Sequence, residues 1–520
     1  MSNSQAKGRD NISNFILKKS ETPLLKQVLL KFFNTMLNYL VTPVNLNISI
    51  IRPILKDQNK SSQEINNIRP ISISNSLSQI LEKLILIKSP QLLKTSRNQF
   101  GFKKHSSCQH AIFVAKETLA NYIDKGSKVK AVSLDAEKAF DKLWTDGLFY
   151  KLHDKMEHDF WFLLKTYYDQ SKAIININGN ESDLFRIGCG VKQGGILSPY
   201  LFNIMIDDLL KECLDKNVGA LYENINTCIL AYADDILLIS PNDMHLQILL
   251  DICHKYSVEW KIKFNPAKSS IIDFSNNKTD REFRLGSQVL AYSKEIKYLG
   301  IIIDENLDFN RQYINKFNKV QKTVFSLKYL GLKTNSISPF LQSFIYKTYC
   351  LSTFTYGFEN ATINKSARDE INVKQNNLIR QILGMKKFSH ISKTLKALKV
   401  FQIEHLYMYY KLIFINNIKS NEICKIILNT IINESDTNTN IKNDKKSKSF
   451  KNDCKLLSNF FQSSIDMIQS DINSYIKKLK DCFINNDCPI YSSIITCFIN
   501  YKSSIYRKIF RDITELNIIK

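Results

Sequence analysis

Two adjacent carboxylates, Asp234 and Asp235, stand in the middle of an apolar stretch that spans residues 228–239. β-forming residues flank the pair on both sides, so the stretch predicts a strand, a tight turn and a second strand. Two neighbouring like charges repel each other, and a bound cation is a common reason for placing them at such a turn. The pair therefore indicates a divalent metal site.

A second apolar stretch, roughly 100 residues earlier, reaches Asp135 and continues to Asp141. One carboxylate from each strand end, plus the neighbouring carboxylate, supplies donor oxygens for two Mg²⁺ ions about 4 Å apart. Sites of this kind carry out phosphoryl transfer. We expect two Mg²⁺ ions as cofactors, with Mn²⁺ as the alternative ion.

These stretches resemble motifs of reverse transcriptases. Residues 232–235 are similar to the central motif, and residues 134–141 to the first metal-binding motif as it occurs in non-LTR retrotransposons and group II introns. Residues 190–202 resemble the block that lies over the incoming nucleotide. Because the three motifs occur in order, the chain is identified by resemblance as a LINE-like reverse transcriptase, its polymerase region present without an endonuclease.

The resemblance implies a catalytic role for three carboxylates. Asp135 and Asp234 would bridge the two metal ions, and Asp235 would support them. The backbone carbonyl of Ala136 would be a further metal ligand. The metals would activate the primer 3′-hydroxyl and stabilise the leaving pyrophosphate.

The resemblance also implies a set of nucleotide-binding residues. Phe140 would be an aromatic gate beneath the sugar that favours dNTPs, since a 2′-hydroxyl would clash with it. Gln193 and Gly194 would touch the incoming base pair and sugar, and a glycine lets backbone approach a ligand closely.

Three cations are expected near the triphosphate. Arg69 would pair with phosphate oxygens, which suit a planar guanidinium. Lys56 is a second candidate for the same task, and Lys268 would lie near the pyrophosphate as its proton donor. A surface ion pair is the alternative for Arg69, and a solvated side chain is the alternative for Lys268.

The fold class expected from the resemblance is α+β. It is a right-hand polymerase with fingers, an RRM-like palm on an antiparallel sheet, and a helical thumb, followed by a mostly α-helical C-terminal region. The predicted domains are an N-terminal extension and fingers (1–127), a catalytic palm (128–304), a thumb and connection (305–432), a polar linker (433–453) and a helical C-terminal region (454–520).

Local patterns predict some of the helices. Residues 24–40 and 371–383 have helical periodicity. Ser198 followed by proline predicts a helix start with Ser198 as its cap. Apolar residues spaced three or four apart from Phe309 to Leu327 predict one helix face, and lysines including Lys316 would present cations to the template–primer from the opposite side.

Composition points to a polyanionic partner. The 520 residues carry a formal net charge of +23, which indicates nucleic acid. The eleven cysteines contain no C-x-x-C pair and suggest a reducing compartment. We expect an intracellular protein of the nucleus or cytoplasm without membrane contact, because neither a signal peptide nor an apolar run of about 18 residues is visible.

The expected function is an RNA-directed DNA polymerase of a non-LTR retroelement, which adds dNTPs to the 3′-hydroxyl of a DNA primer or nicked target DNA on an RNA template. The alternatives are a group II intron-type reverse transcriptase and a decayed relative that binds nucleic acid without polymerising. No histidine follows His405, so a C-terminal Cys-Cys-His-Cys knuckle is not expected. The oligomeric state stays open.

Overall fold

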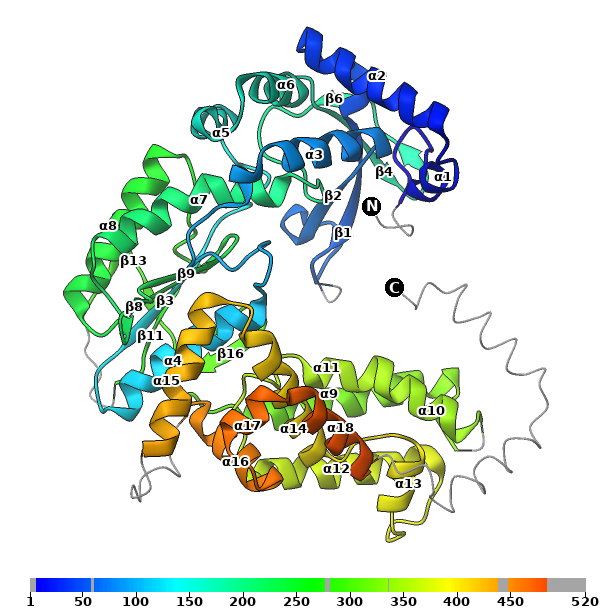
Figure 1. Cartoon of the computed structure of the whole chain (residues 1–520), viewed down its shortest axis with the longest axis vertical. Helices are drawn as coiled ribbons and strands as arrows, with labels where there is room; N and C mark the ends of the chain where they lie inside the picture. Colours follow the sequence, from blue (N-terminus) through cyan, green and yellow to red (C-terminus); the bar gives the residue numbers. More distant parts are fainter. Residues whose placement is uncertain (1–5, 58–59, 276–280, 335, 438–447, 484–520) are drawn as a thin grey trace. The chain divides into compact units, whose positions relative to one another are not determined.

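The computed structural model describes residues 6–57, 60–275, 281–334, 336–437 and 448–483 (Figure 1). The chain divides into two compact units. The first contains Met1–Ala111 and Ser127–Leu299, and the second contains Ile112–Gly126 and Gly300–Lys520. The segment at 112–126, which the sequence groups with the fingers, therefore belongs to the second unit. Residues 438–447 of the predicted linker and 484–520 of the predicted C-terminal region lie outside the described residues.

A five-stranded sheet forms the centre of the first unit, with the strand order β14–β11–β3–β10–β9. Strands β3 (Lys130–Asp135) and β10 (Asp235–Ser240) are antiparallel neighbours, and β9 (Ile229–Tyr232) pairs antiparallel with β10. On the other side, β11 (Ser270–Asp273) is antiparallel to β3, whereas β14 (Ala291–Tyr292) is parallel to β11. The sheet is thus mostly antiparallel.

Two helices cover strands of this sheet. Helix α7 (Ser198–Asp215) packs against β9, and helix α8 (Asp243–Glu259) packs against β10 and against α7. Strand β10 is apolar along nearly its whole length because it lies between two other strands and beneath a helix.

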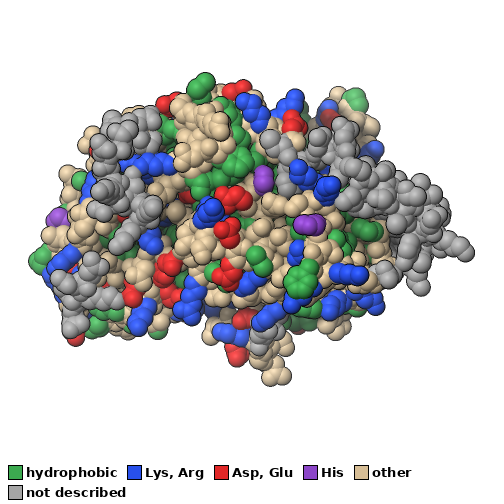
Figure 2. Space-filling view, turned by 90° about the horizontal axis from the view of Figure 1, so that it is seen from below, with side chains coloured by type: hydrophobic (Ala, Val, Ile, Leu, Met, Phe, Trp, Pro, Cys, Tyr) green, Lys and Arg blue, Asp and Glu red, His purple; other side chains and the backbone are tan. Residues whose placement is uncertain are grey.

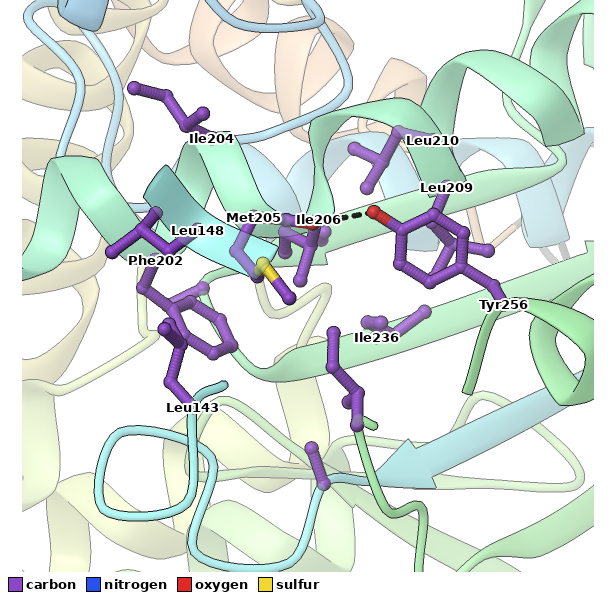
Figure 3. Packing of buried hydrophobic residues seen from close by; sticks show 14 of the residues in the cluster. Leu143, Leu148, Phe202, Ile204, Met205, Ile206, Leu209, Leu210, Ile236 and Tyr256 are labelled. Atoms are coloured by element: carbon purple, nitrogen blue, oxygen red, sulfur yellow. Dashed lines mark hydrogen bonds between the residues drawn. The ribbon is translucent and has the colours of Figure 1, made fainter. Parts of the chain in front are cut away.

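The core beneath these helices holds the central sheet in place (Figure 3). Phe202, Met205 and Leu209 of α7 are buried in one cluster with Ile236 of β10. The Tyr256 hydroxyl of α8 donates a hydrogen bond to the Met205 carbonyl at 2.5 Å. This packing fixes β10, and with it the carboxylates at its start.

The start of α7 differs from the sequence-based prediction. Ser198 is the first helical residue, and the N-cap position is Leu197, which makes no side-chain cap. The Glu82 carboxylate accepts hydrogen bonds from the backbone N–H groups of Ile196 (2.7 Å) and Leu197 (3.1 Å) instead. The prediction of Ser198 as the cap was wrong, because a carboxylate far away in sequence satisfies the helix end.

A second sheet, with strand order β2–β1–β4–β5, lies in the same unit. Strands β1 (Ile48–Leu55) and β2 (Ile68–Ser74) form an antiparallel hairpin, and β4 (Lys172–Ile177) runs parallel to β1. The short strands β5 (Asn180–Glu181) and β6 (Phe185–Arg186) both pair with β4.

The remaining elements of the first unit surround these sheets. They are α1 (Asn14–Lys19), α2 (Pro23–Tyr39), η1 (Val44–Asn47), η2 (Ile65–Asn67), α3 (Ser76–Lys88), η3 (Pro90–Leu93), α5 (Thr145–Leu152), η4 (His153–Lys155), α6 (His158–Asp169), β7 (Leu221–Tyr222), β8 (Ile225–Asn226), β12 (Arg284–Leu285), β13 (Gln288–Val289) and β15 (Glu295–Tyr298).

The described part of the second unit is almost entirely helical. Its elements are α4 (Cys108–Asp124, which begins in the first unit), β16 (Ile301–Asp304), α9 (Asn310–Ser326), η5 (Leu327–Leu330), α10 (Pro339–Ile345), the π-helical η6 (Tyr346–Leu351), α11 (Ser352–Thr355), α12 (Lys365–Leu383), α13 (Ser392–Ala397), α14 (Ile403–Ile418), α15 (Glu422–Thr437), α16 (Lys451–Phe461), α17 (Ile465–Ser470) and α18 (Ile472–Phe483). Helices α15 and α16 extend into both ends of the predicted linker 433–453.

Helix α9 has the apolar face that the sequence predicts. Tyr313, Phe317, Val320 and Val324 are all buried. Lys316, expected among the solvent-facing cations, is instead half-buried, and its ammonium donates to the Tyr356 carbonyl at 2.8 Å. Burial lowers the pKa of Lys316 to about 8. Lys316 is therefore less exposed than the sequence predicts, and its contact with a template–primer stays a prediction.

A buried ionic network links helices of the second unit. The Lys411 ammonium of α14 lies 2.9 Å from the Asp453 carboxylate of α16 and is fully buried. The same carboxylate accepts hydrogen bonds from the hydroxyls of Tyr407 and Thr362. Burial lowers the pKa of Lys411 to about 8, although Asp453 opposes the shift.

Within the described ranges, every helix is too short or too polar to cross a membrane. The eight cysteines described there are free thiols.

Candidate active site

The carboxylates of the sequence motifs meet at one end of the central sheet. Asp235 begins β10 and lies directly opposite Asp135, which ends β3. Asp234 lies in the two-residue turn that joins β9 to β10, since Tyr232 pairs with Asp235. The predicted convergence of both motifs at one sheet edge is therefore present in the structure.

The electrostatics of this edge favour a cation. Asp235 is open to solvent on one side, but burial on its other sides, together with the charges of Asp234 and Asp135, raises its pKa to about 6. Lys297 opposes this shift. Burial is also the main cause that raises the pKa of Asp234, and Asp135 adds to it. Each carboxylate thus destabilises the ionised form of its neighbours, and a bound cation would oppose this effect.

These residues have the donors for a divalent metal, since carboxylate and carbonyl oxygens are the ligands that Mg²⁺ prefers. Among the described residues, however, no three His, Cys, Asp or Glu side chains converge closely enough to form a ready ligand set. The donor chemistry therefore fits the metal, while the side chains are not gathered around one point.

Hydrogen bonds to the buried segment 99–101 fix the turn that contains Asp234. Ala233 has a positive φ of 54°, which is uncommon for a residue with a side chain. The buried Gln99 side-chain oxygen accepts hydrogen bonds from the N–H groups of Ala233 (2.9 Å) and Gly101 (2.8 Å). A Cβ on Gly101 would lie 2.6 Å from the Ala233 nitrogen, so only glycine allows this close approach.

Lys268 and the residues before it border Asp135. The Lys268 ammonium lies 3.8 Å from a carboxylate oxygen of Asp135, and both side chains are partly exposed. The Asn265 N–H donates to the Asp135 carbonyl at 2.8 Å. Ala136 forms a bridge with Phe264. The segment before β11 thereby positions both the carboxylate and the backbone that follows it.

The loop that contains Gln193 and Gly194 is fixed against β2. The Ser72 N–H donates to the Gln193 carbonyl at 2.7 Å. Gly194 has a φ of 112°, and a Cβ there would lie 2.8 Å from the Ser72 oxygen. Gly194 is thus required by the backbone conformation as well as by close packing.

A buried polar network supports this loop from the interior. The Lys192 ammonium contacts the Asn47 side-chain oxygen and the Tyr167 hydroxyl (3.3 Å). The Tyr167 hydroxyl donates to Glu82 at 2.9 Å. Burial lowers the pKa of Lys192 to about 8, and Glu82 opposes this shift.

Phe140 and Asp141 connect the first motif to the same loop. Phe140 is half-buried and stacks on Phe202, with 4.8 Å between ring centroids and 16° between planes. The Gln193 side-chain amide donates to the Asp141 carboxylate at 2.7 Å. Burial raises the pKa of Asp141, while the bond from Gln193 opposes the shift.

The β1–β2 hairpin supplies the cations. Arg69 on β2 is exposed and lies opposite Ile54 of β1. Lys56 follows β1 directly, and its ammonium donates to the Asn66 carbonyl at 3.0 Å. Arg69 is close enough to Asp234 to lower its pKa, against the larger effect of burial.

One cavity of about 1080 Å³ brings all of these groups together. Every predicted site residue lines it, namely Lys56, Arg69, Asp135, Ala136, Phe140, Gln193, Gly194, Asp234, Asp235 and Lys268. A more open hollow of about 430 Å³ lies along α7, lined by Asp208, Lys211, Glu212, Asp215 and Lys216, and contains none of them.

The sequence-based reasoning missed several residues of the site. Asp141 and Lys192 lie within the motifs at 134–141 and 190–202, but no role followed from their spacing, and Gln99 lies outside these motifs. Glu82 had no signal in the sequence at all. Each of them acts through a partner distant in the chain, and such a partner is visible only in the folded structure.

Comparison with known proteins supports the motifs. Residues 55–303 match the family described as reverse transcriptase (RNA-dependent DNA polymerase). The chain is 26% identical over 392 residues to the RNA-directed DNA polymerase from mobile element jockey of Drosophila funebris, covering 73% of this chain and 42% of that protein. It is also 26% identical over 390 residues to the probable RNA-directed DNA polymerase from transposon BS of Drosophila melanogaster, covering 72% of this chain and 42% of that relative.

The matched region therefore spans less than half the length of these relatives. Among solved structures, telomerase from Candida tropicalis in complex with a fragment of telomeric RNA is similar with a TM-score of 0.38 and 11% identity. That similarity covers 77% of this chain and 63% of the telomerase chain.

Proposed function

We propose that this chain, whose residues 55–303 form a reverse transcriptase domain, is an RNA-directed DNA polymerase of a non-LTR mobile element. The family match confirms the expected resemblance to reverse transcriptases. The observation that carries the proposal further is the single cavity lined by all ten residues of the expected site. Asp135 and Asp235 lie there opposite each other on adjacent strands, with Asp234 in the turn beside them.

The carboxylates would hold the divalent metals. Asp135, Asp234 and the Ala136 carbonyl would supply the ligand oxygens, and Asp235 would support them from beside. When bound, the metals supply activation of the primer 3′-hydroxyl and stabilisation of the leaving pyrophosphate. The raised pKa values of Asp234 and Asp235 support this assignment, because burial and, secondarily, the neighbouring carboxylates raise them, and a bound cation would favour the ionised forms.

The other residues of the cavity would bind and orient the nucleotide. Arg69 and Lys56, at the end of the β1–β2 hairpin, would pair with the triphosphate. Gln193 and Gly194 would lie along the base pair and sugar. Phe140, held by stacking on Phe202, would close the space beneath C2′ and exclude ribonucleotides.

Lys268 would act next to the leaving group. Its ammonium already lies 3.8 Å from an Asp135 carboxylate oxygen, so it is within reach of groups bound at that carboxylate. In this position the Lys268 ammonium would place a positive charge beside the pyrophosphate and donate a proton to it.

We further propose a right-hand arrangement of fingers, palm and thumb. The β1–β2 hairpin would belong to the fingers, the central sheet with Asp135 and Asp235 to the palm, and α9 with its neighbours to the thumb. The partners would be an RNA template, a DNA primer and dNTPs, in keeping with a net charge of +23.

Primer extension tests the proposal. Wild-type protein is mixed with an RNA template, an annealed DNA primer and Mg²⁺, and is given dNTPs or rNTPs separately. We expect extension with dNTPs only, and measurable rNTP use by Phe140→Val, which opens the space beneath the sugar. Folded protein that binds the duplex without extending it would overturn the proposal and favour a decayed binding relative.

The group II intron alternative is tested in the same system. A protein of that type would bind a structured intron RNA in preference to other RNAs of equal length. We expect no such preference in competition binding, because the features on which the proposal rests lie in the polymerase cavity.

A further inference from the structure

The second unit contains two long stretches without a single acidic residue. Residues 309–358 hold seven Lys and Arg, and residues 371–403 hold seven more, with no Asp or Glu in either. The two stretches pack on each other, since α9 contacts α12 and the Lys374 ammonium donates to the Asn318 side chain at 3.2 Å. Figure 2 shows one face of the molecule on which Lys and Arg side chains lie among hydrophobic side chains and a central group of Asp and Glu side chains.

A tight turn after α12 carries an exposed aromatic ring in the second of these stretches. The Ser389 N–H donates to the Lys386 carbonyl at 3.0 Å, which places Lys387 and Phe388 at the tip of the turn. The Phe388 side chain is 88% exposed. The Lys387 ammonium lies 5.5 Å from the centre of its ring.

The base of this turn is held firmly. The Arg380 guanidinium donates to the Ser389 carbonyl at 3.0 Å, and the Met385 N–H donates to the Arg380 carbonyl at 2.9 Å. The Thr334 hydroxyl donates to the Gln381 carbonyl at 3.3 Å. The backbone that carries Phe388 is therefore already positioned for a ligand at the tip, which reduces the entropy lost on binding.

Packing does not account for Phe388. A phenyl ring this exposed contributes little apolar burial to folding, and the turn is closed by backbone hydrogen bonds that do not need an aromatic side chain. An exposed ring that directly follows two lysines, in a stretch without acidic residues, is suited to a nucleic-acid base, which stacks on the ring while the adjoining phosphates contact the lysines.

We propose that the 386–389 turn is a contact site for single-stranded nucleic acid. Phe388 stacks on one base, and Lys386 and Lys387 pair with the adjoining phosphates. Stacking needs an unpaired base, so the site prefers single strands to duplex. Binding at this turn does not require polymerase activity, so the two proposals are tested independently.

Binding to a fluorescently labelled 15-mer of uridylate tests the site in the full-length chain. We expect Phe388→Ala to raise the Kd roughly 5- to 100-fold, the range of a lost stacking contact, and Lys387→Ser to weaken the salt dependence of log Kd by about one unit. Tyr150→Ala, which removes an aromatic residue of similar exposure (77%) in the first unit, is the matched control. A Kd for Phe388→Ala within twofold of wild type would overturn the proposal.

A second variant reports on the site directly, whatever other surfaces bind the RNA. Phe388→Trp places a fluorophore at the tip, and a stacked base should quench it beyond the change that the native tryptophans show in the wild-type protein. No added quenching would overturn the stacking contact. Phe388-dependent binding to phosphatidylserine vesicles, with unchanged RNA binding, would assign the turn to a membrane surface instead.

Discussion

Replacing Gln99 with methionine would test how the fold positions Asp234. The Gln99 side-chain oxygen accepts hydrogen bonds from the N–H groups of Ala233 and Gly101, and Gln99 is 99% buried within the first unit. Methionine has a similar length and volume and cannot accept these bonds with comparable strength. The change therefore removes two hydrogen bonds with little change in packing.

The expected cost follows from the two orphaned donors. A buried N–H that loses its acceptor costs about 1–3 kcal/mol, so the two together should cost roughly 2–6 kcal/mol of unfolding free energy. The turn next to Asp234 also loses the hydrogen bond to Gln99 that stabilises the positive φ of Ala233. Nucleotide incorporation should therefore fall in kcat more than in KM for dNTP.

Urea denaturation measures the stability, and single-nucleotide extension measures the activity. Gln247→Met is the matched control, since Gln247 makes comparable hydrogen bonds on the exposed side of α8, where a substitution should cost less than about 0.5 kcal/mol. A Gln99→Met protein with unchanged unfolding free energy and unchanged kcat would refute the reasoning that this side chain supports the turn.

Three further predictions concern other parts of the structure. Gly194→Ala should reduce dNTP incorporation at least tenfold in steady-state assays, because its φ of 112° strains any other residue and the added Cβ meets backbone at 2.8 Å. Lys411→Met should destabilise the chain by roughly 3–5 kcal/mol, since Asp453 is left as a buried unpaired charge. The Lys411 pKa of about 8 in the folded protein lies below its value of 10.5 in the unfolded chain. Between these two pH values the unfolded state binds more protons, so the unfolding free energy of the wild type relative to Lys411→Met should rise with pH from 8 to 10.5. Urea midpoints of the two proteins that do not diverge over this range would contradict the prediction. Lys268→Ala should slow incorporation much less than Asp234→Ala in primer extension, and equal losses would contradict the ranking.

The strands and the turn that carry the three carboxylates could be predicted because local pattern determines them. An apolar run of strand length on each side of Asp234 and Asp235 forces a hairpin, and a second run ending at Asp135 supplies the neighbouring strand. The order of the blocks along the chain then indicates which loops surround the carboxylates. This explains why all ten expected residues line one cavity.

What the sequence could not reveal depends on contacts between distant segments. The sequence predicts that Ser198 caps helix α7, yet Glu82 from another helix accepts hydrogen bonds from the N–H groups of the two residues before the helix. Helical periodicity predicts a solvent-facing position for Lys316, yet its ammonium donates a hydrogen bond to the Tyr356 carbonyl and the side chain is half-buried. In both cases the local pattern offers a reasonable partner, and the tertiary structure provides a better one.

Residues 112–126 belong to the second unit for a similar reason, namely a contact between segments that are distant in the sequence. Helix α4 follows the fingers in sequence, but its buried Glu117 accepts hydrogen bonds from Ser449 (2.6 Å) and from the N–H of Phe450 (3.0 Å). A pairing across more than 300 residues leaves no periodic trace in the sequence. The predicted boundary at residue 127 could not take it into account.

The most direct test of the central claim is single-nucleotide incorporation on poly(rA)/oligo(dT) with dTTP and Mg²⁺ by four proteins. These are the wild type, Asp135→Asn, Asp234→Asn and the control Asp251→Asn, which changes an exposed carboxylate of α8. The account predicts incorporation by the wild type and the control, and loss to the protein-free background in the other two, with their folding unchanged by circular dichroism. Incorporation by Asp234→Asn at the wild-type rate would contradict the assignment of this sheet edge as the catalytic centre.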